Sequence, residues 1–199
     1  MMKIVIIGGV AGGMSAATRL RRLNEDAEII VLEKGPFVSF ANCGLPYYVS
    51  GDIQERSDLL VQTPEQLRAR FDLDVRPFSE ATAIDPDKKE VTVRSKDGEY
   101  QLAYDKVILS PGAKPFVPPA EGLSEASNIF TGRNVPDVDA VTGFILEHKP
   151  KKAVVIGAGF IGLEMAESLA HRGLAVTIVE KAPHVLPPFD EEMAAYLAD

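Results

Sequence analysis

Three short stretches of this sequence carry residues whose types and spacing could do chemistry. Cys43 is the only cysteine in 199 residues, and it lies in the run Ser39–Pro46. Two glycine-rich turns, Gly8–Gly13 and Gly157–Gly162, each follow an apolar stretch and precede a helical one. Such a turn places backbone amides against the pyrophosphate of a dinucleotide. Two dinucleotide sites imply electron transfer between two cofactors, and the thiol suggests sulfur as the next acceptor.

A single thiol limits the chemistry that is open to this chain. Cys43 cannot close a disulfide within the chain, so any disulfide chemistry must involve a second molecule. A free thiol is only a few per cent thiolate at neutral pH unless its surroundings help. We expect Asn42 to cap a helix whose first turn contains Cys43, which would provide such help. A buried structural cysteine is the alternative interpretation from spacing alone.

The second turn, Gly157–Gly162, reads GxGxxG, and an acidic residue, Glu180, follows its first glycine by 23 residues. This combination is typical of a dinucleotide site. The first turn departs from the pattern because Val10 replaces the middle glycine, yet its residues are small throughout. We therefore predict that two sets of turn residues bind cofactors: Gly8, Gly9, Val10, Ala11, Gly12 and Gly13, and Gly157, Gly159, Phe160, Ile161 and Gly162.

Glu33 and Glu180 each end the second strand of their unit. A carboxylate at that position can accept hydrogen bonds from both ribose hydroxyls of an adenosine. Glu180 would repel a 2′-phosphate and so favours NADH, while the adjacent Lys181 leaves NADPH possible. The alternative for either residue is a solvated glutamate at a strand end.

The elements that must position these residues form two similar units. We expect a strand at Lys3–Ile7, a helix from about Gly12 to Leu23 and a strand at Glu28–Glu33, which together form a parallel βαβ crossover. The later unit predicts strands at Ala153–Ile156 and Ala175–Glu180 around a helix that runs to about Arg172. Gly8 matches Gly157, Gly13 matches Gly162, and Glu33 matches Glu180, which indicates an internal duplication.

The middle of the chain predicts further elements. Thr63, Pro64 and Gln66 are typical of a capped helix start, so we expect a helix to about Phe71. Asp87–Arg94 and Gly98–Leu102 predict a hairpin, and Lys106–Leu109 predicts a buried strand that ends at Ser110. A linker, Lys114–Ser127, precedes the second unit. The chain stops within a helix expected from Glu191, which suggests a fragment with an incomplete second domain.

Composition excludes some classes of function. Apolar residues make up 46% and charged residues 25% of the chain, and the net charge is −8. The acidic balance argues against a nucleic-acid partner, and no apolar run approaches the roughly 20 residues of a membrane span. One cysteine and no signal peptide predict a cytoplasmic location. We expect no metal site.

The run Ser39–Pro46, followed by Tyr47, closely resembles the active-site signature of coenzyme A disulfide reductases. These enzymes form the single-cysteine branch of the flavin-dependent pyridine nucleotide–disulfide oxidoreductases. Ile4–Gly13 resembles the FAD fingerprint of that family, Ser110–Ala113 its second flavin-contacting turn, and Gly157–Gly162 its NAD(P)H site. The resemblance covers essentially all 199 residues.

The resemblance implies an α/β fold with three-layer (ββα) Rossmann-like FAD- and NAD(P)-binding domains, the second one truncated. Residues 1–150 would form the FAD domain, and residues 151–199 would begin the NAD(P)H domain. A C-terminal dimerisation domain would be absent from this chain, and the full-length protein would be a homodimer. Isolated, the chain should bind FAD weakly and turn over poorly.

The activity implied is NAD(P)H-dependent reduction of coenzyme A disulfide, with Cys43 as the catalytic residue held in a mixed disulfide with coenzyme A. The resemblance adds Lys34, Asn42, Ser110, Pro111 and Gly112 to the cofactor contacts, and it places Ser15, Arg19, Arg22, Ser39 and Asn42 at the substrate. The two arginines lie on one helical face, where they could bind phosphate or be merely solvated. Some relatives use a lysine to bind coenzyme A at the position where this chain has Phe71.

Three alternatives stay open at this point. Persulfide or polysulfide reductases share Asn42–Pro46 almost verbatim. NADH oxidases and peroxidases of the family also use one cysteine, but they carry a histidine where this chain has Val10. The third alternative is not an enzyme: an NADH-sensing redox flavoprotein in which Cys43 is a resting thiol.

Overall fold

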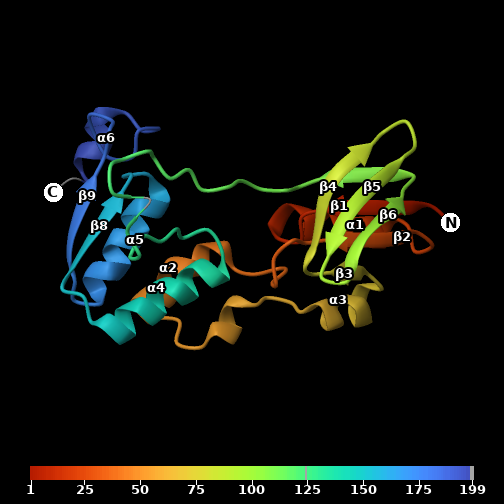
Figure 1. Ribbon diagram of the computed structural model, residues 1–199, viewed down its shortest axis with the longest axis horizontal. Helices are drawn as coiled ribbons and strands as arrows, with labels where there is room; N and C mark the ends of the chain where they lie inside the picture. Colours follow the sequence, from red (N-terminus) through yellow and green to blue (C-terminus); the bar gives the residue numbers. More distant parts are fainter. Residues whose placement is uncertain (124, 198–199) are drawn as a thin grey trace. The chain divides into compact units, whose positions relative to one another are not determined.

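The computed structural model describes residues 1–123 and 125–197 (Figure 1). The chain divides into two compact units. The first contains residues 1–41 and 60–114, and the second contains residues 42–59 and the described part of 115–199. These units do not share bounds with the nucleotide-binding domains expected at 1–150 and 151–199, which stay a prediction.

The first unit is built on a parallel sheet of four strands. Its strands are β1 (Lys3–Ile7), β2 (Glu28–Leu32), β3 (Asp74–Arg76) and β7 (Lys106–Leu109), in the order β3-β2-β1-β7. Helix α1 (Ala11–Leu23) connects β1 to β2, as the predicted crossover requires. Ile7 pairs with Leu32 on one side and with Leu109 on the other, so three strands end at one edge.

Alternate residues of β1 and β2 face opposite sides of the parallel sheet, which gives this unit its three layers. Ile4, Ile6 and Val31 face a core shared with α1 and α3 (Pro64–Phe71). Val5 and Ile30 face a second core shared with an antiparallel sheet. That sheet contains β4 (Ser79–Asp85), β5 (Glu90–Ser95) and β6 (Gly98–Ala103). Both faces of the parallel strands are therefore buried, and the predicted ββα layering is confirmed.

Local signals in this unit were mostly reliable. The Thr63 side chain accepts from the Gln66 amide while the Gln66 side chain accepts from the Thr63 amide, which is the predicted capping box. The predicted hairpin is β5 and β6. Strands β3 and β4 were not predicted, because β3 is three residues long and β4 lacks a regular apolar alternation.

The second unit repeats a strand, helix and strand. β8 (Lys152–Ile156) and β9 (Ala175–Val179) pair in parallel, and α5 (Phe160–His171) connects them. Helix α4 (Val135–His148), which was not predicted, precedes β8. The remaining elements are the 3₁₀ turns η1 (Asn42–Gly44) and η2 (Arg56–Leu59), α2 (Leu45–Ser50) and α6 (Glu191–Ala195).

Two further findings bear on function. None of the helices in the described ranges is long and apolar enough to cross a bilayer. In the same ranges, no group of three or more His, Cys, Asp or Glu side chains is placed to hold a metal ion.

Candidate functional site

The first glycine turn is shaped by contacts too close for any other residue. Gly8 has φ +105°, and a Cβ there would lie 1.9 Å from the carbonyl oxygen of Ser110. A Cβ on Gly13 would lie 1.8 Å from the carbonyl oxygen of Gly8. The Gly8 amide donates to the Leu32 carbonyl at 2.8 Å. The turn therefore closes tightly over the strand ends, and the start of α1 packs directly on β1.

The structure brings several predicted site residues to this turn. Ser110 comes directly after β7, and because β7 pairs with β1, this residue lies beside the first glycine turn. Its amide donates to the Ile7 carbonyl at 2.8 Å. A Cβ on Gly12 would meet the Ser110 hydroxyl oxygen at 2.4 Å. Ser39, in the left-handed region at φ +48°, donates its amide to the Gly9 carbonyl at 2.9 Å. Pro111 and Gly112 continue from Ser110 and are exposed.

A carboxylate clamps the first turn. Glu33 follows β2, and its Oε2 accepts the Gly9 amide at 2.8 Å while its Oε1 accepts the Gly35 amide at 2.7 Å. One side chain thus joins the glycine turn to the loop after the second strand. Each oxygen keeps a further lone pair, so the carboxylate could still accept a ribose hydroxyl.

The second turn reproduces this geometry. Gly157 has φ +102° and donates its amide to the Val179 carbonyl at 2.8 Å. A Cβ on Gly162 would lie 1.9 Å from the Gly157 carbonyl oxygen. Glu180 accepts the amides of Ala158 at 2.6 Å and Ala182 at 2.7 Å. The two βαβ crossovers therefore share the same backbone contacts as well as a similar sequence.

The clamp also affects the charge of Glu180. Backbone hydrogen bonds from Ala158 and then Ala182 lower the pKa of this carboxyl below its ordinary value. Glu180 is therefore ionised at neutral pH. An ionised carboxylate at this strand end disfavours a nearby phosphate.

The helices that follow the turns begin in a way that suits an anion. Neither α1 nor α5 has an acidic residue in its first turn. No side chain of a described residue caps the start of either helix. Both starts thus present backbone N–H groups and the positive end of the helix dipole. The tight glycine turns and these uncapped starts fit the pyrophosphates of two dinucleotides.

Cys43 is an exposed free thiol in the second unit. The expectation that Asn42 caps its helix is wrong. Residues 42–44 form the 3₁₀ turn η1, and Gly44, not Asn42, occupies the N-cap position of α2. Pro46 fits in the first turn of α2, so the helix begins after Cys43. The alternative of a buried structural cysteine is excluded by the exposure of this residue.

The cysteine segment is tied to the rest of the second unit by polar contacts. Arg172, at the end of α5, donates from Nε to the Val49 carbonyl at 2.7 Å. Asp139 of α4 pairs with Arg56 at 3.3 Å. Burial, followed by the charge of Asp139 and a hydrogen bond to it, raises the pKa of Tyr48. These contacts hold α2 and its flanks against α4 and α5.

The predicted substrate residues on α1 are accessible. Ser15, Arg19 and Arg22 are all exposed. Arg21, which the prediction left out, instead bonds the backbone: its Nε donates to the Phe71 carbonyl at 2.9 Å. Phe71 itself is partly buried and packs against the core of the first unit. Lys34 is exposed beside Glu33.

Sequence reasoning missed Arg133, whose NH1 donates to the Asn42 Oδ1 at 3.3 Å. The signal that could have located its segment is the helix start at α4, where Asn134, Pro136 and Asp137 occupy typical N-terminal positions. The contact itself joins residues 91 positions apart and has no local signature.

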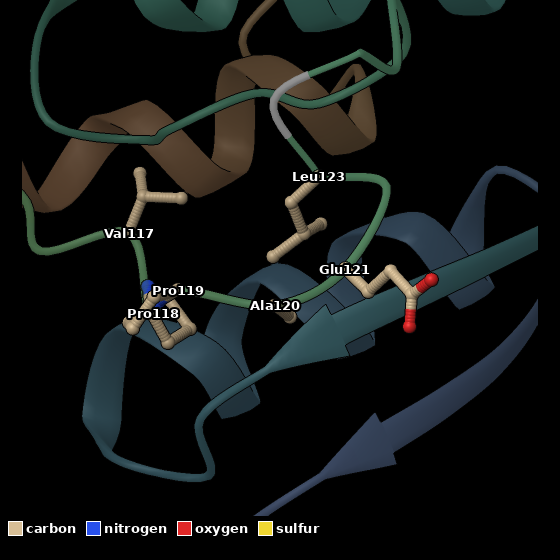
Figure 2. A pocket seen from close by; sticks show the side chains of 6 residues that line it. All are labelled: Val117, Pro118, Pro119, Ala120, Glu121 and Leu123. Carbon is tan, nitrogen blue, oxygen red and sulfur yellow. The ribbon is translucent and has the colours of Figure 1, made fainter.

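A hollow in the second unit is lined by residues of the linker and by none of the predicted site residues. Figure 2 shows its lining along one curved loop, with the Glu121 carboxylate pointing away from Val117 and Leu123. The other lining residues are Pro118, Pro119 and Ala120. One carboxylate and apolar side chains offer no nucleophile and no anion cradle, so we assign this hollow no role.

Comparison with known proteins places the chain in a family. The family model described as pyridine nucleotide-disulphide oxidoreductase matches residues 2–199, so the chain belongs to this oxidoreductase family. It is 42% identical to a coenzyme A disulfide reductase of Staphylococcus haemolyticus, covering 100% of this chain and 45% of that protein. It is 40% identical to an NADH oxidase of Methanocaldococcus jannaschii, covering 97% of this chain and 43% of that protein.

Solved structures agree with this assignment. The reduced CoADR-RHD of Bacillus anthracis matches with a TM-score of 0.96 and 55% identity, covering 98% of this chain and 36% of that one. An NAD-dependent persulfide reductase of A. fulgidus matches with a TM-score of 0.93 and 39% identity, covering 99% and 37%. The chain thus spans less than half the length of these relatives.

The clamp geometry predicts how Glu180→Gln behaves. Glutamine offers one acceptor oxygen where the carboxylate offers two, so one of the two backbone amides loses its partner. We expect the amide of Ala158 or of Ala182 to exchange with solvent about tenfold faster, measured residue by residue by hydrogen exchange. Glu167→Gln, at an exposed position of α5, should leave both rates unchanged.

The same comparison has a defined pH dependence. Because the pKa of Glu180 is lowered from 4.5, the protection should be complete above that value and should be lost as the pH falls through the lowered pKa. Equal exchange rates in the parent and Glu180→Gln at neutral pH would contradict the clamp.

Proposed function

We propose that the protein is a flavin-dependent NADH:disulfide oxidoreductase that reduces coenzyme A disulfide through Cys43. The observation that carries the proposal is an exposed single thiol in a chain with two carboxylate-clamped glycine turns. The similarity to coenzyme A disulfide reductases supports the substrate. FAD, NADH and coenzyme A would be the cofactors and covalent partner.

The chain's own residues would hold the two cofactors in separate turns. Gly8–Gly13 and the start of α1 would bind the pyrophosphate of FAD, with Glu33 at its ribose and Ser110–Gly112 alongside. Gly157–Gly162, in which Phe160 and Ile161 are exposed, would bind the pyrophosphate of NADH. When bound, FAD would take hydride from NADH and pass the electron pair to sulfur. The ionised Glu180 would favour NADH over NADPH.

The sulfur chemistry would proceed in two balanced steps. The Cys43 thiolate attacks coenzyme A disulfide, which forms a Cys43–coenzyme A mixed disulfide and releases one coenzyme A thiolate. Two electrons and protons from NADH and solvent then cleave the mixed disulfide and yield the Cys43 thiol, free coenzyme A and NAD⁺. Arg19 and Arg22 would bind the phosphates of coenzyme A, and Ser15, Ser39 and Asn42 would line its path.

A second candidate is reduction of a persulfide, because the chain is 39% identical to an NAD-dependent persulfide reductase. The Cys43 thiolate would then take the outer sulfur of the persulfide and release the coenzyme A thiolate, and two electrons from NADH would reduce the resulting Cys43 persulfide to the Cys43 thiol and sulfide. The two proposals differ in the preferred acceptor, so the ratio of kcat/KM values for coenzyme A disulfide and for a coenzyme A persulfide separates them. The domain division near residue 151, a homodimer and a cytoplasmic location are further proposals that rest on the family resemblance and composition.

The proposal predicts the covalent state and the role of Cys43. Intact mass spectrometry of the non-reduced, full-length protein should show an adduct of one coenzyme A on Cys43 that dithiothreitol removes. Cys43→Ser should lose disulfide turnover by at least about a thousandfold, because a serine hydroxyl cannot form the mixed disulfide, while NADH-dependent dye reduction persists. Retained disulfide turnover in Cys43→Ser, measured by thiol release, would refute the proposal.

Matched glycine substitutions should separate the two cofactor sites. A Cβ on Gly13 or Gly162 meets a backbone carbonyl at 1.8 or 1.9 Å, so each turn must open to admit it. Gly13→Ala should purify with little flavin. Gly162→Ala should retain flavin and raise the KM for NADH at least about tenfold.

A third substitution serves as the control for these two. Apart from the neighbouring backbone of α4 itself, no described atom lies within 4 Å of a Cβ on Gly143, so Gly143→Ala should change neither flavin content nor KM. Loss of flavin in Gly162→Ala, with an unchanged KM for NADH in the flavin-loaded fraction, would reverse the assignment of the turns.

A further inference from the structure

Arg133 lies in a short segment whose backbone is fixed before α4 begins. Asp137 Oδ2 accepts both the Thr131 hydroxyl at 2.7 Å and the Arg133 amide at 2.8 Å. The Asp137 amide in turn donates to the Asn134 Oδ1 at 2.9 Å, which caps the helix. Three hydrogen bonds around one helix start therefore set the position of the Arg133 backbone.

Packing against α5 fixes the other side of this segment. A Cβ on Gly132 would lie 2.7 Å from the terminal methyl of Met165, so the backbone at Gly132 packs against a side chain of α5. The segment is thus held both at α4 and at α5. Its position depends on the same helix that starts at the second glycine turn.

From this position Arg133 reaches the residue next to the cysteine. Its NH1 donates to the Asn42 Oδ1 at 3.3 Å, and both groups are partly buried. A guanidinium has five donors and no acceptor, so only the oxygen of the Asn42 amide can face it. The Nδ2 donor group of Asn42 must then point away from Arg133. This contact sets the orientation of the Asn42 side-chain amide.

We propose that Arg133 is a positioning residue for the thiol chemistry: it fixes Asn42 as a hydrogen-bond donor beside Cys43. The inference rests on the proposed function, because the oriented N–H donor of Asn42 has a chemical role only if a disulfide at Cys43 is cleaved. Cleavage of a disulfide at Cys43 places negative charge on sulfur, and a fixed N–H donor stabilises developing charge without reorganisation. Arg133 also places a permanent positive charge on the side chain of the residue that precedes Cys43.

The first test measures the reactivity of the Cys43 thiol itself, in the reduced, flavin-loaded, full-length protein. Iodoacetamide is the probe, and alkylation of Cys43 is followed by peptide mass spectrometry at neutral pH. Arg133→Gln presents either an oxygen or an amide nitrogen to Asn42, so the orientation is no longer set. We expect alkylation and kcat for coenzyme A disulfide to fall about tenfold, with the KM for NADH unchanged.

Two further variants distinguish positioning from a general structural effect. Arg133→Lys keeps a donor-only group and should recover most of the rate. Asn42→Ala should be as slow as Arg133→Gln, and combining the two should add little, because both remove the same oriented donor. Arg94→Gln, at an exposed arginine of β5, should behave as the parent does.

Alkylation at the parent rate in Arg133→Gln would overturn the proposal. Alkylation rates that fall in the double variant by the product of the two single losses would also overturn it. So would an Arg133→Lys variant that melts at the parent temperature but does not recover the rate. The alkylation assay needs no turnover. If Cys43→Ser still reduces coenzyme A disulfide, the proposed function fails while the coupling between Arg133 and Asn42 is still decided by alkylation.

Discussion

A carboxylate that accepts two backbone amides is the contact on which both nucleotide-binding units depend. Glu33 and Glu180 each stand after the second strand of a βαβ crossover, and each joins the glycine turn to the loop beyond that strand. The contact works only because Gly8 and Gly157 adopt a left-handed conformation that turns the next amide toward the carboxylate. Strand pairing, turn shape and helix start are thereby fixed together, and the uncapped helix start is left for an anion.

The two compact units of the chain differ in what surrounds their functional residues. In the first, the turn is enclosed by Ser110 and by Val38, and the sheet is buried on both faces. In the second, the cysteine segment is tied to α4 and α5 through Arg133, Arg172 and Asp139. The thiol therefore belongs to the same compact unit as the turn proposed for NADH. Placement of Cys43 depends on side chains contributed from far along the chain.

Much of the fold could be predicted because its signals are local. The apolar runs of β1 and β2, the glycine turns and the Thr63 capping box each act within a few residues, and all were confirmed as elements of the fold. Prediction failed where distant pairing decides the outcome. Strand β4 exists because it pairs with β5. Gly44 displaced Asn42 from the cap, and Asn42 instead met Arg133, a contact that no spacing along the chain could reveal.

The central claim is that an electron pair from NADH ends on the disulfide at Cys43. The direct measurement is an anaerobic NADH titration of flavin-loaded, full-length protein after oxidation with coenzyme A disulfide, alongside Cys43→Ser treated identically. The account predicts that the parent consumes one more equivalent of NADH per chain before its flavin absorbance bleaches. It should also release one coenzyme A thiol that the serine variant does not. Equal consumption by the two proteins, with no thiol released, would contradict the account.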